Sequence, residues 1–172
     1  MHYRAYDRDL SRGDGMDPAG FATLISGLTA DLAGRPLDAA LARHLNATRP
    51  PGGRDYSALF EVCRAGVAAG WLCNRTAGGV RYGRAIKPGP ASDGFSVDVV
   101  EMADLEGPFH AHPHGEIDLV MPLDPTARFD GHGAGWVVYG PGTAHHPTVS
   151  GGRALVLYLL PQGAIDFQAS PP

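Results

Sequence analysis

The stretch His110-Ala111-His112-Pro113-His114-Gly115-Glu116 places three imidazoles and a carboxylate at alternating positions near the middle of the chain. Gly142-Thr143-Ala144-His145 follows downstream and adds another imidazole. Successive side chains of a β-strand point to opposite faces, so residues spaced by two project from one side of a sheet. Imidazole and carboxylate groups gathered in this way indicate a metal site. They favour one divalent first-row transition metal such as Fe, Mn, Ni or Zn over Mg or Ca.

The segments around these histidines have the pattern of an antiparallel β-structure. From about Val80 onward, glycine and proline recur every few residues, and the apolar segments are short and rich in valine and leucine. Turn sequences such as Asp130-Gly131 separate them. The predicted strands are 81–87, 95–102, 108–112, 117–121, 136–139 and 153–160. Short strands with tight turns and no helical pattern between them predict a barrel or a double-sheet jelly roll.

The N-terminal part of the chain has helical periodicity instead. Asp17-Pro18 is a suitable helix start, and apolar residues then recur every three or four positions from Phe21 to Leu32. A second helix is expected to end near Asn46, and a third to run from Ser57 to about Leu72 with an apolar stripe at 60, 63, 67 and 71. The predicted fold is therefore α+β but mainly β. About three helices in residues 1–78 pack on a β-barrel formed by residues 79–172, in a single compact unit.

Composition excludes several classes of protein. The chain has 172 residues and a formal net charge of -4, and it contains no Lys/Arg cluster that could neutralise a run of phosphates, so no nucleic-acid partner is expected. No window approaches the roughly 18 consecutive apolar residues of a membrane span, and the N-terminus has no signal-peptide core. We therefore expect a cytoplasmic protein that does not bind a membrane. Three amphipathic helices with more apolar surface than they can cover among themselves also predict a homodimer.

Two motifs resemble those of the cupin superfamily. His110-x-His112-Pro113-x-x-Glu116-Ile117 is similar to the first cupin motif, which supplies three metal ligands. The segment 135–145, ending in Pro141-Gly142-Thr143-Ala144-His145, is similar to the second, whose last histidine completes the set. The resemblance implies a cupin-type antiparallel β-barrel, or double-stranded jelly roll, with the ligands His110, His112, Glu116 and His145. The same-face spacing of His114 keeps it as an alternative to His110, and a solvated turn at residues 110–116 is the competing interpretation.

More narrowly, most of the chain resembles the small cupin-type 4-hydroxylaminobenzoate lyases of bacterial nitroaromatic catabolism. The segments that carry this resemblance are the helical N-terminal part, 81–88, 110–123 and 135–167. It implies conversion of 4-hydroxylaminobenzoate and water to 3,4-dihydroxybenzoate, also called protocatechuate, and ammonia. Alternative functions are a cupin oxygenase or isomerase that acts on a small aromatic or polar acid, and a non-catalytic cupin that binds a small ligand.

The implied reaction suggests roles for further residues. A histidine near the metal could transfer protons, and His114 and His146 are the candidates. An aromatic carboxylate substrate also needs a cation and flanking rings. Arg81 and Lys87, which are separated by six, would share one strand face, whereas Arg84 would lie on the other. The predicted substrate-binding residues are thus Arg81, Lys87, Tyr82, Tyr139 and Trp136, although each charge could be an ordinary surface group and Trp136 could simply pack in the core.

Overall fold

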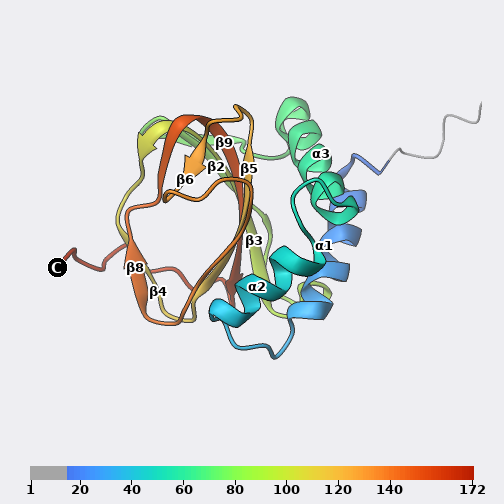
Figure 1. The fold of residues 1–172 in the computed structure, drawn as a ribbon, viewed down its shortest axis with the longest axis horizontal. Helices are drawn as coiled ribbons and strands as arrows, with labels where there is room; N and C mark the ends of the chain where they lie inside the picture. Colours follow the sequence, from blue (N-terminus) through green and yellow to red (C-terminus); the bar gives the residue numbers. More distant parts are fainter. Residues whose placement is uncertain (1–14) are drawn as a thin grey trace, which may run out of the picture.

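The structure, a computed structural model, describes residues 15–172. Figure 1 shows three helices gathered on one side of a β-barrel. The helices are α1 (Pro18–Leu32), α2 (Ala39–Thr48) and α3 (Arg54–Ala69), and a short 3-10 helix, η1, covers Pro90–Ser92. The strands are β1 (Arg75–Ala77), β2 (Val80–Ile86), β3 (Phe95–Glu106), β4 (His110–His112), β5 (Glu116–Pro122), β6 (Arg128–Phe129), β7 (Gly135–Tyr139), β8 (Thr143–His145) and β9 (Thr148–Pro161).

The three predicted helices are confirmed. Asp17 and Asp38 cap α1 and α2 by accepting hydrogen bonds from backbone N–H groups of the first turn, and α3 ends at Gly70, which has the positive φ of 83° that glycine tolerates best. The third helix begins at Arg54 rather than at Ser57. Its buried face also differs from the predicted stripe, because the residues fully buried on α3 are Tyr56, Leu59, Val62, Cys63 and Gly66.

Two sheets form the barrel. The larger has seven strands in the order β1-β2-β3-β9-β5-β7, with β6 paired to β9, and the smaller pairs β4 with β8; every pairing is antiparallel. The long strands β3 and β9 pair from Phe95↔Pro161 to Glu106↔Thr148 and form the spine of the large sheet. Each of the six predicted strands is present. The sequence pattern missed β1, β6 and β8, which have two or three residues each and are too short for periodicity to reveal.

The large sheet is buried on both faces near its centre. Alternate residues of β3, β5 and β9, such as Val99, Leu119 and Leu157, pack in one core with the helices. The residues between them, such as Val120 and Tyr158, face the barrel interior and pack in a second core. The consequence for β5 is that every residue from Glu116 to Met121 is buried, including two carboxylic acids. Polar groups held in such a place need a specific partner.

The three helices pack on one face of the large sheet, and the homodimer stays a prediction. Buried apolar residues of all three helices belong to the core that they share with the sheet, so the faces on which the homodimer prediction rested are covered within one chain. The edge strand β7 is covered as well, because the Asn46 side chain both donates to the Trp136 carbonyl at 2.9 Å and accepts from the Trp136 N–H at 3.0 Å. None of the helices within residues 15–172 has the length and apolar character of a membrane-spanning segment.

Candidate metal centre and cavity

Four side chains from three strands converge inside the barrel. His110 and His112 lie on β4, His145 lies on the adjacent β8 with His110 as its cross-strand partner, and Glu116 begins β5. One ligand atom from each of these residues lies within 4.8 Å of all the others. The four predicted ligands therefore form a possible metal site. His112 and Glu116 are fully buried, and His110 is nearly so.

Each histidine of this cluster uses its Nδ1 atom outside the site. His110 Nδ1 donates to the Pro108 carbonyl at 3.2 Å. His112 Nδ1 donates at 3.1 Å to the Thr143 hydroxyl, whose own proton goes to the Gly140 carbonyl at 2.7 Å. His145 Nδ1 donates to the Asp130 carboxylate at 2.6 Å. Because a neutral imidazole carries one proton, these partners assign it to Nδ1 in all three rings and leave three Nε2 lone pairs that point inward.

The inward-facing atoms have no suitable partner of their own. His110 Nε2 and His145 Nε2 lie 3.2 Å apart, and His112 Nε2 lies 3.2 Å from a Glu116 carboxylate oxygen. With the protons on Nδ1, both contacts bring two hydrogen-bond acceptors together. Neither His112 Nε2 nor either Glu116 oxygen has a hydrogen-bond partner within the described residues, which is costly for buried polar atoms. A cation among these four groups would satisfy all of them, so the residues present fit a metal ion.

Burial lowers the pKa of His110 to about 4, and the neighbouring His112 and His145 rings add to this effect although Glu116 opposes it. His110 is therefore neutral near pH 7, which is the form that can bind a metal. Asp118, two residues after Glu116 on β5, is also fully buried, and neither of its oxygens has a partner in the described part of the chain. Burial, together with the Glu116 carboxylate, raises the pKa of Asp118 well above its usual range.

Asp130, in the turn after β6, holds the outer side of the cluster. One carboxylate oxygen accepts hydrogen bonds from His145 Nδ1 at 2.6 Å and from the Tyr139 hydroxyl at 2.5 Å, and the other accepts from the Thr148 N–H at 2.8 Å. Burial by itself would raise the pKa of Asp130, but these hydrogen bonds lower it on balance. Asp130 therefore stays ionised and fixes both the tautomer and the direction of the His145 ring.

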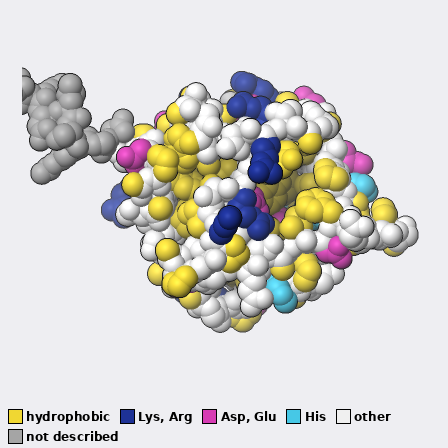
Figure 2. Space-filling view, turned by 180° about the vertical axis from the view of Figure 1, so that it is seen from behind, with side chains coloured by type: hydrophobic (Ala, Val, Ile, Leu, Met, Phe, Trp, Pro, Cys, Tyr) yellow, Lys and Arg dark blue, Asp and Glu magenta, His cyan; other side chains and the backbone are white. Residues whose placement is uncertain are grey.

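A cavity of about 650 Å³ opens beside the cluster. His110 and Glu116 reach it at one place, and Tyr158 on β9 lines it from the barrel interior. The remaining walls are mostly apolar and come from β2, β3 and the C-terminal segment, including Val100, Met102, Leu160, Ile165 and Phe167. Figure 2 shows a hollow with hydrophobic walls on this side of the molecule and Lys and Arg side chains beside it. The volume and the apolar walls suit a small aromatic molecule.

Of the predicted substrate-binding residues, Tyr82 and Lys87 line the cavity. Arg84 lines it too, whereas Arg81 points to the other side of β2 and forms an ion pair with Glu101 at 2.9 Å. The predicted sharing of one face by Arg81 and Lys87 is therefore wrong. The pairing of β2 with β3 shifts register between Arg84 and Ile86, which breaks the strict alternation of the strand.

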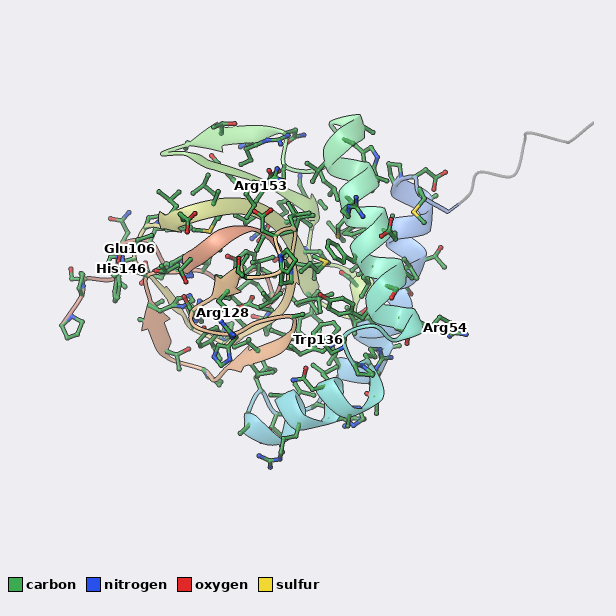
Figure 3. All side chains as sticks on the ribbon, turned by 45° about the horizontal axis from the view of Figure 1, so that its top comes forward. Arg54, Glu106, Arg128, Trp136, His146 and Arg153 are labelled. Atoms are coloured by element: carbon green, nitrogen blue, oxygen red, sulfur yellow. The ribbon has the colours of Figure 1, made fainter. Side chains whose placement is uncertain are left out.

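The two remaining rings lie away from the cavity lining. Trp136 packs between β7 and the helices, where its indole N–H donates to the Arg49 carbonyl at 3.0 Å, and Figure 3 shows it on the helix side of the barrel. Tyr139 contacts the cluster from behind, with ring centroids 4.7 Å from His145 and 5.5 Å from His112. Trp136 is thus placed as a core residue and Tyr139 as a neighbour of the histidines.

The structure brings neither predicted proton-transfer histidine into the cluster or the cavity lining. β4 ends at His112, so His114 lies in the following turn, loses the same-face relation to His110, and is exposed. His146 is also exposed, donates from Nδ1 to the Gly107 carbonyl at 3.2 Å, and lies beside Glu106 at the end of the barrel away from the helices (Figure 3). The structure thus places His110, and not His114, in the cluster that could hold a metal ion.

Sequence reasoning missed four residues around the cluster. Asp118 could have been noticed as a carboxylate within the apolar strand predicted at 117–121, and Tyr158 as a polar ring within the strand at 153–160. The local sequence indicates only a turn at Asp130 and only a motif position at Thr143. Their roles depend on contacts between segments far apart in the chain, which no local pattern contains.

Comparison with known proteins gives one consistent result. The family model described as "PnbB: 4-hydroxylaminobenzoate lyase" matches residues 23–167. A 4-hydroxylaminobenzoate lyase of Nocardioides sp. (strain LMS-CY) is 33% identical over 151 residues, covering 83% of this chain and 89% of that protein. A protein of the same name from Pseudomonas putida is also 33% identical over 151 residues, covering 77% and 86% of the two chains.

Weaker similarity is found to solved structures. An RmlC-like cupin protein from Ralstonia eutropha has a TM-score of 0.39 and 18% identity, covering 49% of this chain and 57% of that one. The DMSP lyase DddQ from Ruegeria pomeroyi has a TM-score of 0.38 and 19% identity, covering 84% and 76%.

Proposed function

The chain belongs to the 4-hydroxylaminobenzoate lyase family, and from this premise we propose that it converts 4-hydroxylaminobenzoate and water to 3,4-dihydroxybenzoate and ammonia. The observation that carries this proposal is the cluster of His110, His112, Glu116 and His145 beside an apolar cavity of aromatic size. The cluster supplies a place for the polar chemistry of the hydroxylamino group, and the cavity supplies one for the ring.

We propose that the four residues hold one divalent first-row transition metal such as Fe, Mn, Ni or Zn. Three imidazole nitrogens and one carboxylate favour these ions over Mg or Ca. When bound, such an ion supplies a Lewis acid and lowers the pKa of a coordinated water, so that hydroxide is accessible near neutral pH. The Nδ1 hydrogen bonds to Pro108, Thr143 and Asp130 support this role, because they hold the rings ready to bind.

The reaction requires the N–O bond to break with loss of the hydroxyl group as water. One water adds to the ring carbon ortho to the nitrogen-bearing carbon, and a second hydrolyses the imine at the nitrogen-bearing carbon and releases ammonia, so one water is consumed overall. The walls around Val100, Met102 and Leu160 are apolar, so the cluster supplies polar groups that can hold the reacting water at its own end of the cavity. Burial raises the pKa of Tyr158, with nearby carboxylates adding to the effect, so its hydroxyl keeps its proton. Tyr158 is therefore suited to donate a hydrogen bond to a substrate in the cavity.

An assay for ammonia and 3,4-dihydroxybenzoate, combined with an oxygen electrode, tests this function. Metal-loaded protein should release both products from 4-hydroxylaminobenzoate without taking up oxygen. His112→Ala should lose bound metal and activity together, since it removes a fully buried ligand. Oxygen uptake would indicate an oxygenase, and binding without product would indicate a non-catalytic cupin. Full activity in metal-stripped protein would refute the metal-dependent chemistry.

A further inference from the structure

The cavity lining carries histidine and carboxylate groups at the cluster and positively charged groups in another part. His110 and Glu116 lie at the cluster, whereas Arg75, Arg84 and Lys87 contribute cations from β1, β2 and the residue just after β2. We name these three residues the cationic rim. We propose that the cationic rim binds the carboxylate of a para-substituted benzoate and so directs the opposite substituent to the histidine cluster. This inference rests on the proposed function and names residues that determine its specificity.

The strand order supports a separation that matches a single ring. Arg84 lies on β2 and Glu116 on β5, and the order β2-β3-β9-β5 places three strand spacings between them. At about 4.8 Å per spacing, the two backbones are about 14 Å apart across the sheet. Both side chains reach into the same cavity, which shortens this distance from both ends. A backbone separation of this order leaves room for a ligand the size of one aromatic ring between the two side chains.

The charge balance of the rim favours an anion. Asp98 pairs with Arg84 in a bidentate arrangement, with N···O distances of 2.9 and 3.1 Å. Neither Lys87 nor Arg75 has an ion pair with any described residue. Three cations therefore face one carboxylate, and the rim keeps an excess positive charge that a substrate carboxylate can neutralise.

The position of Arg84 is fixed by more than Asp98. Gly163, which has a φ of 67°, lies so close that a Cβ atom placed there would come within 2.9 Å of an Arg84 Nη atom. The backbone of the C-terminal segment thus packs directly on the guanidinium group. Arg84 is held by its neighbours, whereas Lys87 lines the cavity without an ion pair to any described residue and is available to an incoming carboxylate. A positioned guanidinium beside an unpaired ammonium group suits recognition of a small anion.

The rings beside the rim suit an aromatic ligand. Tyr82 and Phe167 are the two large hydrophobic residues of the described chain that are clearly exposed, at 37% and 54%, and both line this cavity. The Phe167 ring also lies 5.3 Å from the His110 ring, so the aromatic surface extends from the rim to the cluster. Exposed aromatic side chains gathered at a cavity indicate a ligand-binding surface rather than chance exposure.

Lys87 is the single lysine of the sequence, which allows a direct test by chemical labelling. An amine-reactive reagent can modify only its side chain and the N-terminal amine, and mass spectrometry distinguishes the two. We expect 4-aminobenzoate to protect Lys87 from modification, and aniline, which lacks the carboxylate, to leave it reactive. Equal protection by the two compounds, or none by 4-aminobenzoate at a concentration that saturates binding in calorimetry, would overturn the proposal.

Substitution gives a second measurement. Lys87→Met keeps the length of the side chain but removes its charge, and we expect it to raise the Kd for 4-aminobenzoate about tenfold or more, as loss of a charged hydrogen bond does. Arg81→Met is the matched control, because Arg81 lies on the adjacent strand β2 but is not in the cavity lining and pairs with Glu101. This control should leave the Kd within about twofold, a change well below that of a lost charged contact. A Kd that changes equally in both variants would refute the assignment of Lys87.

Kinetics separate this inference from the proposed function. With 4-hydroxylaminobenzoate, Lys87→Met should raise KM more than it lowers kcat, and the preference for this substrate over phenylhydroxylamine should fall. If the wild-type protein releases ammonia equally well from both compounds, the function stands and the carboxylate site is wrong. If it converts neither but binds 4-aminobenzoate through Lys87, the carboxylate site stands and the function is wrong.

Discussion

Asp130→Asn tests how much of the metal site depends on a residue that does not belong to the cluster. The substitution keeps the size of the side chain but replaces a carboxylate that accepts three hydrogen bonds with an amide that has one oxygen and one NH₂ group. If the amide oxygen faces His145 and Tyr139, the NH₂ group meets the Thr148 N–H. If the amide is turned the other way, the NH₂ group meets the donors of His145 and Tyr139 instead.

The magnitude follows from these contacts. In the better orientation one hydrogen bond is lost, and the His145 hydrogen bond becomes one to a neutral acceptor. An unpaired buried donor costs about 1–3 kcal/mol of folding free energy. His145 is also no longer confined to the tautomer with its Nε2 lone pair inward, and loss of such an outer partner typically lowers metal affinity about 10- to 100-fold. We expect both effects.

The assay is competition with a chromophoric chelator for metal affinity, together with urea unfolding of metal-free protein for stability. Asp124→Asn is the control, because the Asp124 carboxylate also accepts a backbone hydrogen bond, from Arg153 N–H at 2.7 Å, but is not among the groups that face the cluster. The control should lose some stability and keep its metal affinity. A wild-type metal affinity in Asp130→Asn would refute the idea that Asp130 prepares His145 for binding.

Three further predictions concern other parts of the molecule. Asn46→Ala should lower the free energy of unfolding by about 1–3 kcal/mol in urea titration, because it leaves the Trp136 N–H and C=O of the edge strand without partners; an unchanged midpoint would contradict this. Burial opposes ionisation of Asp31, but hydrogen bonds from its basic neighbours lower its pKa from 3.8 to about 2, so the stability it adds is present above pH 3.8 and is lost as the pH falls towards 2. Asp31→Asn should flatten the unfolding free energy over that pH range, and an identical profile would show that the ion pairs add nothing. Removal of a general acid or base typically lowers activity about 100-fold or more. His114→Ala and His146→Ala should each lower activity far less than this, since both residues lie outside the cavity lining. A loss of about 100-fold in either variant would identify that histidine as a proton donor.

Local periodicity predicted most of the fold. A helix or strand that packs one face on a core has apolar or inward-facing residues at regular intervals in its sequence. Such intervals occur from Phe21 to Leu32 in α1 and from His110 to His112 in β4. Alternation also predicted that histidines of this segment share a strand face, but it left His110 and His114 as alternatives, and the motif resemblance supplied the set of four residues that the structure brings together. The pattern did not reveal β1, β6 and β8, which have two or three residues each and are stabilised by their partner strands.

Irregularities of the strands account for the errors. A single register shift between Arg84 and Ile86 moved Lys87 to the face of Arg84, and alternation counted across that point gives the opposite answer. The end of β4 at His112 likewise removed His114 from the face it would have shared with His110. Both features arise where the backbone adjusts to neighbouring segments. Asp130 shows the same limit. Its hydrogen bond with His145 forms only when the turn at residue 130 meets β8 in the folded chain.

The arrangement of the cluster explains why folding and metal binding are expected to be linked. Folding brings His110 Nε2 to 3.2 Å from His145 Nε2, and His112 Nε2 to 3.2 Å from Glu116, while Nδ1 hydrogen bonds keep protons away from these contacts. The apo protein therefore carries an electrostatic cost that a cation removes, and a ligand that binds only the folded state stabilises it in proportion to the logarithm of its concentration. Added metal should raise the unfolding midpoint of the wild-type chain but not that of His112→Ala. An equal shift in both would show that the ion binds elsewhere and that the four inward-facing groups do not hold it.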